Sequence, residues 1–111
     1  MTKQSADSEI KNEILRLSKH PEKVRITQSA YYDMMGLGLK KFDVCDAICE
    51  WINKGKDVHI IITKDAKGHI GKPAYVMKPE INGIKCYVKV SIQNIQKTDE
   101  SLLIISTHVE H

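Results

Sequence analysis

The chain has 111 residues, of which 41% are hydrophobic and 28% are charged, with a formal net charge of +3. This length and composition fit one globular domain over residues 1–111, and they exclude a wholly disordered chain, a collagen-like rod and a long coiled coil. No apolar run approaches the roughly 18 residues of a membrane-spanning helix, and residues 1–7 lack the apolar core of a secretory signal, so we expect a cytoplasmic protein with no membrane contact.

Residues 1–55 have the spacing of a mainly helical region. A first helix is predicted to begin at an N-cap, either Asp7 or Ser8, and to end at His20-Pro21, because the residue before proline disfavours the α conformation. Its apolar residues form one stripe: Ile10, Ile14, Leu15 and Leu17.

Two further helices are predicted after a short extended segment at 24–26. Thr27 is the expected N-cap of the second helix, which Gly36-Leu37-Gly38 ends. The third helix covers roughly Lys41 to Asn53, with apolar residues three and four positions apart and Gly55 just beyond its end.

Residues 56–111 change to alternating, β-branched sequence, typical of antiparallel strands. The predicted strands are 58–63, 74–78, 86–92 and 102–107. A loop at 64–73, a hairpin turn at Asn82-Gly83 and a polar turn at 94–101 connect them. Helices followed by a meander predict an α+β fold, with about three N-terminal helices on one face of a twisted antiparallel sheet formed by the C-terminal half.

Alternation in the third predicted strand assigns its two faces. Cys86, Val88, Val90 and Ile92 share an apolar face that should pack on the helices. Tyr87, Lys89 and Ser91 share the other face, where an aromatic ring and an ammonium group can stack a base and hold a phosphate. The alternative is that Tyr87 packs across the strands and Lys89 is only solvated.

The charge is unevenly distributed along the chain. Residues 1–53 are neutral overall, whereas residues 54–97 contain nine lysines and three acidic residues, a net of +6. A basic C-terminal half is what a phosphate-binding face requires, although a Lys-rich solvated sheet has the same composition.

The three cysteines, Cys45, Cys49 and Cys86, favour free thiols in a reducing compartment. Cys45 and Cys49 fall on one helix face, but the next histidine, His59, stands alone, which favours core packing over a zinc site. We expect no metal and no cofactor.

Several short motifs, taken together, resemble the motility quorum-sensing regulator (MqsR) toxin family, RelE-like bacterial proteins that cleave messenger RNA. The motifs are Val24-Arg25-Ile26-Thr27-Gln28-Ser29-Ala30, Leu37-Gly38-Leu39, Cys45-x-x-Ile48, Tyr75-Val76-Met77-Lys78-Pro79, Gly83, Tyr87-Val88-Lys89 and Ile104-Ile105-Ser106-Thr107-His108. The resemblance implies a RelE-like fold, a metal-independent endoribonuclease and a cognate antitoxin protein as partner, with messenger RNA as substrate.

The resemblance also implies site residues. Tyr87 falls on the family's active-site tyrosine, Lys89 on the lysine two positions later, and His108 on the C-terminal catalytic lysine. The lysine after the third helix has two counterparts, Lys54 and Lys56. The family's mid-sheet glutamine has none, and Lys72 lies nearest to its position.

Metal-free RNA cleavage needs a base for the 2′-hydroxyl, an acid for the leaving 5′-oxygen and cations around the phosphate. Histidine suits both proton transfers because its ordinary pKa is about 6.5. We therefore predict Tyr87, His108, Lys56 and Lys89 as catalytic residues. The predicted RNA-binding residues are Lys54, His59, Lys72 and Lys78. The alternative is a catalytically weak or inactive RelE-like module that binds RNA or a protein through its basic sheet face.

Overall fold

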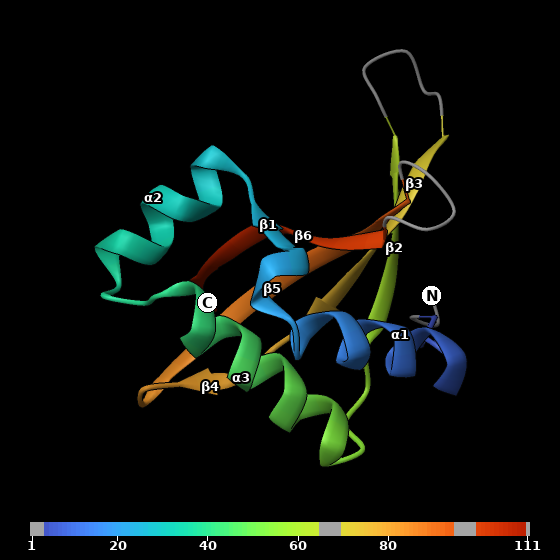
Figure 1. Ribbon diagram of the computed structural model, residues 1–111, viewed down its shortest axis with the longest axis horizontal. Helices are drawn as coiled ribbons and strands as arrows, with labels where there is room; N and C mark the ends of the chain where they lie inside the picture. The colour runs from blue at the N-terminus through green and yellow to red at the C-terminus, as the bar shows by residue number, and fades with distance from the viewer. Residues whose placement is uncertain (1–3, 65–69, 95–99, 111) are drawn as a thin grey trace.

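The computed structural model describes residues 4–64, 70–94 and 100–110, and over these residues the chain forms three α-helices, one 3-10 turn and six strands (Figure 1). The helices are α1 (Ser8–Ser18), η1 (Pro21–Lys23), α2 (Gln28–Gly36) and α3 (Lys41–Asn53). The strands are β1 (Val24–Ile26), β2 (His59–Lys64), β3 (Ile70–Met77), β4 (Glu80–Ile81), β5 (Ile84–Asn94) and β6 (Glu100–Val109). None of these helices is long and apolar enough to cross a bilayer.

The helix boundaries follow local hydrogen-bonding chemistry, and the three predicted helices are confirmed. The Asp7 carboxylate accepts a hydrogen bond from the Ile10 N–H at 2.9 Å, and the Thr27 hydroxyl accepts one from the Ala30 N–H at 3.2 Å. Beyond the end of α3, Gly55 has a φ of +71°, a left-handed conformation that glycine adopts without a steric penalty.

The sheet is mixed, which corrects the prediction of a purely antiparallel sheet built from the C-terminal half. Its strand order is β1-β6-β5-β3-β2, with β4 paired to β5. β1 runs parallel to β6, with Val24 opposite Leu102 and Ile26 opposite Ile104. β1 is only three residues long, and so short a sequence does not indicate which strand it will pair with or in which direction. The path of the chain between α1 and α2 sets that direction.

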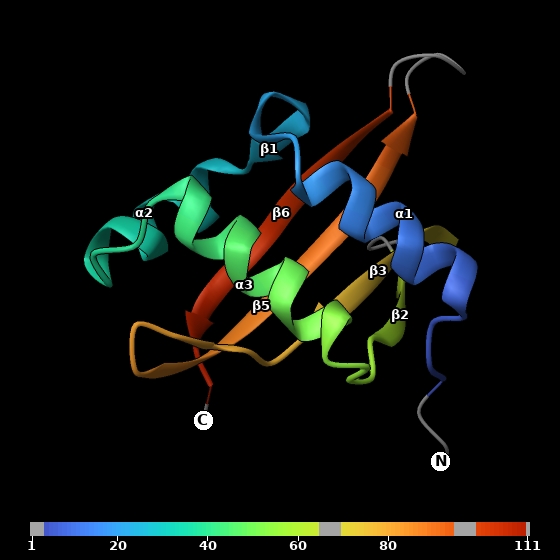
Figure 2. The same ribbon diagram turned by 60° about the horizontal axis from the view of Figure 1, so that its bottom comes forward.

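The N-terminal half protects both edges of this sheet. β1 covers part of the outer edge of β6, and α2 packs beside the rest of it (Figures 1 and 2). At the opposite edge, the Ala6 N–H donates to the Val58 carbonyl at 2.7 Å and the Ile60 N–H donates to the Gln4 carbonyl at 2.8 Å. Parts of both edges of the sheet are therefore covered by backbone from residues 1–55, the half predicted to be mainly helical.

The strands are longer than predicted. β3 begins at Ile70, so the end of the predicted loop 64–73 is strand; β5 reaches Asn94 and β6 begins at Glu100, within the predicted turn 94–101. The centres of both connections, 65–69 and 95–99, lie outside the described residues. The hairpin turn is confirmed, because Asn82 and Gly83 both have positive φ, 52° and 81°, between β4 and β5.

α1 and α3 cover one face of the sheet (Figure 2), and the hydrophobic core lies between these two helices and the sheet. The predicted alternation of β5 is confirmed from Cys86 to Val90: Cys86, Val88 and Val90 are fully buried on this helix-covered face. Beyond Val90 it is weaker, because Ile92 is half-buried and Ser91, predicted on the other face, is buried. The opposite face, which we call the open face, receives Tyr87 and Lys89 from the same strand.

A β-bulge in β6 determines which residues reach the open face. Lys89 pairs with Ser106, but the next residue, Val90, pairs with Ile104, so Ile105 is an extra residue in β6. Ile104 and Thr107 are consequently both buried, although an unbroken alternation would place them on opposite faces. His108, one position later, is exposed on the open face.

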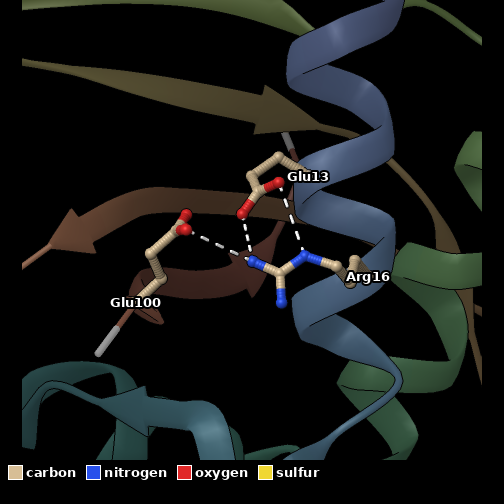
Figure 3. A network of polar contacts seen from close by, with 3 residues as sticks. All are labelled: Glu13, Arg16 and Glu100. Atoms are coloured by element: carbon tan, nitrogen blue, oxygen red, sulfur yellow. Dashed lines mark hydrogen bonds and ion pairs between the residues drawn. The ribbon is translucent and has the colours of Figure 1, made fainter. Parts of the chain in front are cut away.

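An ion-pair network connects α1 with the start of β6 (Figure 3). The Arg16 guanidinium contacts the Glu13 carboxylate within α1 and lies 3.5 Å from the Glu100 carboxylate. The hydrogen bond from Arg16 lowers the pKa of Glu13, and the hydrogen bond with Glu13 raises the pKa of Glu100. Because these side chains are 31–45% exposed, the network contributes little to the free energy of unfolding.

Thr27 joins α2 to β6, which leads to a test of the fold. Its hydroxyl caps α2 and donates to the Ile105 carbonyl at 3.0 Å. Thr27→Ala removes both hydrogen bonds and should lower the free energy of unfolding by about 1–2 kcal/mol in urea titrations, whereas Thr27→Ser should retain most of it. Ser29→Ala, an exposed change in the same helix, is the control; equal stabilities for the two Thr27 variants would contradict the role.

Candidate functional site

Tyr87 and His108 form a stacked pair on the open face. They are directly opposite one another in the β5–β6 ladder. Their ring centroids are 4.9 Å apart and the ring planes differ by 10°. The structure thus brings together two residues that are 21 positions apart in the sequence and that the family resemblance had selected together. The contact is also the cross-strand packing that was the stated alternative for Tyr87.

A backbone contact next to His108 indicates which of its two ring nitrogens carries the proton. His108 Nδ1 lies 3.0 Å from the Val109 carbonyl oxygen. A carbonyl oxygen only accepts hydrogen bonds, so this contact places the proton of a neutral ring on Nδ1 and leaves Nε2 as an acceptor. Nε2 is therefore the ring nitrogen that can accept a hydrogen bond from a bound hydroxyl group.

Lys89 lies one alternation step from Tyr87 on the same face. It is opposite Ser106 on β6 and Val76 on β3. Among the described residues it has no ion-pair or hydrogen-bond partner, so its ammonium group is available to a phosphate.

The strand register places other cations on the open face. Arg25, on β1, is exposed and lies opposite Leu103, which faces the same side as Ser91. Lys72 alternates with Ala74 and Val76 along β3 and is also exposed. The open face therefore combines two aromatic rings with several cationic side chains.

His59 lies on the open face but away from the stacked pair. It is opposite Val76, in the cross-strand row that continues to Lys89 and Ser106. With β3 and β5 between β2 and β6, three inter-strand spacings of about 4.8 Å separate His59 from His108 by at least about 14 Å. This separation places the two imidazoles on different parts of the open face. The His59 Nδ1 is buried without a hydrogen-bond partner among the described residues.

Lys54 and Lys56 lie elsewhere, beside a cavity of about 500 Å³ between the end of α3 and the β4–β5 turn. Lys54 pairs with Glu50 at 2.6 Å, and this contact lowers the pKa of the Glu50 carboxyl. The Lys56 ammonium lies 5.0 Å from the centre of the Trp51 ring. No contact between described residues joins either lysine to Tyr87 or His108.

Lys78 lines the same cavity and pairs with Glu110 at 2.9 Å, while Lys85 approaches the other oxygen of that carboxylate at 3.8 Å. Because Glu110 follows β6 two residues after His108, Lys78 lies between the two parts of the predicted site. Trp51 is half-buried and donates its indole N–H to the Asp57 carbonyl at 2.9 Å.

A second cavity, of about 360 Å³, adjoins His108 and was not predicted. Its lining residues are Tyr32, Asp33, Gly36, Leu37, His108 and Val109. It forms where α2 passes the end of β6. The sequence contained one signal for it. Ala30 and Met34 are the buried positions of α2, and the positions between and after them carry large side chains that are exposed: Tyr31, Tyr32 and Met35.

The cysteines are free thiols, and those in the core are poorly ionised. Burial raises the pKa of Cys45 to about 11 and also raises the pKa of Cys86. Cys49 is half-buried, with its sulfur 3.1 Å from the Ser18 hydroxyl. Within the described residues there is no group of three or more His, Cys, Asp or Glu side chains that could hold a metal ion.

Comparisons with models of protein families, with curated proteins and with solved structures gave no match for this chain.

The thiols provide a test of this core. In the native protein near neutral pH, we expect a thiol-specific chromogenic disulfide to label Cys49 first, and Cys45 and Cys86 only on unfolding, because both are buried with raised pKa values. Cys49→Ser should abolish the fast phase and Cys86→Ser should leave it intact. A fast phase that survives Cys49→Ser would show that the core packing described above is wrong.

Proposed function

We propose that the protein is a metal-independent endoribonuclease, the toxin of a type II toxin–antitoxin system, with a RelE-like arrangement of helices and sheet. The observation that carries the proposal is the stacked Tyr87–His108 pair beside Lys89 on the open face. The sequence resemblance to the MqsR family supports the same proposal, including messenger RNA as substrate and an antitoxin as partner.

Binding of single-stranded RNA uses the two kinds of group that this face offers. Aromatic rings stack on bases of any sequence, and ammonium or guanidinium groups neutralise the phosphates. Lys89 and Arg25 are exposed or half-exposed at positions that share the open face with the two rings. A phosphate near Lys89 would place its neighbouring ribose beside His108.

The cleavage step follows from the chemistry of these groups. His108 Nε2 removes the proton of the 2′-hydroxyl, the 2′-oxygen bonds to the adjacent phosphorus, and the bond from phosphorus to the 5′-oxygen breaks. The Tyr87 hydroxyl donates a proton to the departing 5′-oxygen, and Lys89 stabilises the charge that develops on the phosphate. The products are a 2′,3′-cyclic phosphate and a 5′-hydroxyl.

In this proposal Tyr87 takes the acid role, because β3 and β5 separate His59 from His108. The lysines at the first cavity would contact a flanking part of the RNA rather than the reacting phosphate: Lys54, Lys56 and Lys78. Each already has a partner there, since Lys54 and Lys78 are ion-paired and Lys56 covers Trp51.

A second candidate function is a binding module without catalysis. The separation of Lys54 and Lys56 from the stacked pair favours it, because the reacting phosphate then has a single nearby lysine. Incubation of the purified protein with single-stranded RNA in EDTA separates the two functions. Cleavage to cyclic phosphate ends supports the nuclease, binding without cleavage supports the module, and cleavage only with added metal refutes the metal-independent mechanism.

His108→Ala tests the proton-transfer role. A general base contributes a rate factor of roughly 100 to 10,000, so cleavage in EDTA should fall on that scale. The thermal unfolding curve should remain close to the wild type, since His108 is exposed. His20→Ala, an exposed histidine remote from the pair, is the control, and unchanged cleavage by His108→Ala would eliminate the role.

Tyr87 can be tested by separating its ring from its hydroxyl. Tyr87→Phe keeps the stack with His108 and should retain RNA affinity while cleavage falls by about 100-fold or more. Tyr87→Ala removes the ring and should lower both. Full cleavage by Tyr87→Phe would assign Tyr87 to base stacking alone and require another acid.

A further inference from the structure

The cavity between α2 and the end of β6 adds a specificity element to the proposed site. We propose that this cavity binds a nucleobase next to the reacting phosphate and that Asp33 selects bases with an exocyclic amine over uracil. The inference rests on the proposed function, because it places the base relative to His108.

The charge of the cavity argues for a base rather than a phosphate. Its lining contains one carboxylate, Asp33, and no lysine or arginine. Asp33 has no hydrogen bond or ion pair from its side chain among the described residues, so its charge is uncompensated. The carboxylate would repel a phosphate in the cavity. The cations that would attract a phosphate, Lys89 and Arg25, lie on the sheet instead.

The shape of the lining also suits a planar ring. Tyr32 from α2 and His108 from β6 contribute rings from the two sides of the cavity, and Leu37 and Val109 contribute apolar surface. Tyr32 is 59% exposed, and its hydroxyl has one long contact, 3.4 Å from the Gln28 side-chain nitrogen. Tyr31 packs against this ring in a T-shaped contact, with the ring centroids 6.0 Å apart, and the exposed remainder of the Tyr32 ring can stack on a base.

Gly36 lines the cavity at the end of α2. A Cβ atom added at Gly36 would meet no atom within 4 Å, so the space beside it is empty of protein. A larger residue at this position can enter that space without displacing the core.

Asp33 gives the cavity a preference among bases. A carboxylate accepts hydrogen bonds, and the exocyclic amines of cytosine, adenine and guanine donate them. Uracil offers a carboxylate only its ring N3–H, and the two carbonyl oxygens that flank this donor repel the carboxylate. Among pyrimidines of the same size, cytosine should therefore bind more tightly than uracil.

The test measures binding without cleavage. Short oligocytidine and oligouridine strands with 2′-O-methyl groups lack the attacking hydroxyl, and fluorescence anisotropy gives their Kd values. The wild type should bind the cytidine strand about fivefold or more tightly than the uridine strand. Asp33→Asn should reduce this ratio to near one, because an amide both donates and accepts, while Asp46→Asn, an exposed change on α3, should keep the ratio.

Two further variants test the ring and the space. Tyr32→Ala should weaken binding of both strands by about fivefold or more, while Phe42→Ala, an exposed aromatic residue of α3 outside the cavity lining, should not. Gly36→Leu removes no functional group and should also weaken binding by filling the cavity. Circular dichroism melting curves of all variants establish that each is folded.

The outcomes distinguish the inference from the function it rests on. If the wild type binds neither strand, the proposed function and the inference are both overturned. If Lys89→Ala weakens binding but the Asp33, Tyr32 and Gly36 variants bind like their controls, the RNA site stands and the base-binding cavity is refuted. A uridine strand that binds as tightly as the cytidine strand would refute the selectivity of Asp33.

Discussion

β5 and β6 are paired from Cys86 opposite Val109 to Asn94 opposite Glu100, and the other features of the molecule depend on this ladder. It places Tyr87 against His108, and its bulge at Ile105 changes the alternation of β6 between the two ends of the strand. Without the bulge, a core that contains Ile104 would direct Thr107 to the open face and His108 into the core. One inserted residue thus keeps the hydrophobic core continuous and still delivers an imidazole to the surface where the aromatic and basic side chains gather.

The order of the strands then assigns roles among residues that composition treats alike. β2 and β6 are separated by two strands, so the two histidines occupy different parts of the open face and only His108 contacts Tyr87. The lysines divide in the same way. Lys89 lies beside the stacked pair, whereas Lys54 and Lys56 gather at the end of α3, where Glu50 and Trp51 engage them. Among the described residues, the lysines that the sequence groups into one basic half are therefore divided between the open face and the end of α3, with Lys78 between them.

The N-terminal half contributes more than the helical layer. Residues 4–6 pair with the backbone around β2, and β1 pairs with β6, so one segment of this half protects each edge of the sheet. α2, held to β6 through Thr27, continues the cover on the β6 side and creates the second cavity beside His108. The same helix that closes the edge therefore becomes a wall of the candidate site.

The sequence by itself determined the local structure: the caps at Asp7 and Thr27, the three helices, the Asn82-Gly83 turn and the two faces of β5. Each depends on neighbours within a few residues, whose hydrogen bonds and side-chain period are encoded locally. It also selected Tyr87, Lys89 and His108, although by family resemblance and alternation rather than by position in space. Only the tertiary structure decided the parallel pairing of β1, the bulge at Ile105, the distance between His59 and His108, and the cavity beside α2. Those features depend on which distant strands become neighbours, and a three-residue strand or a single inserted residue leaves no periodic signal from which that choice could be read.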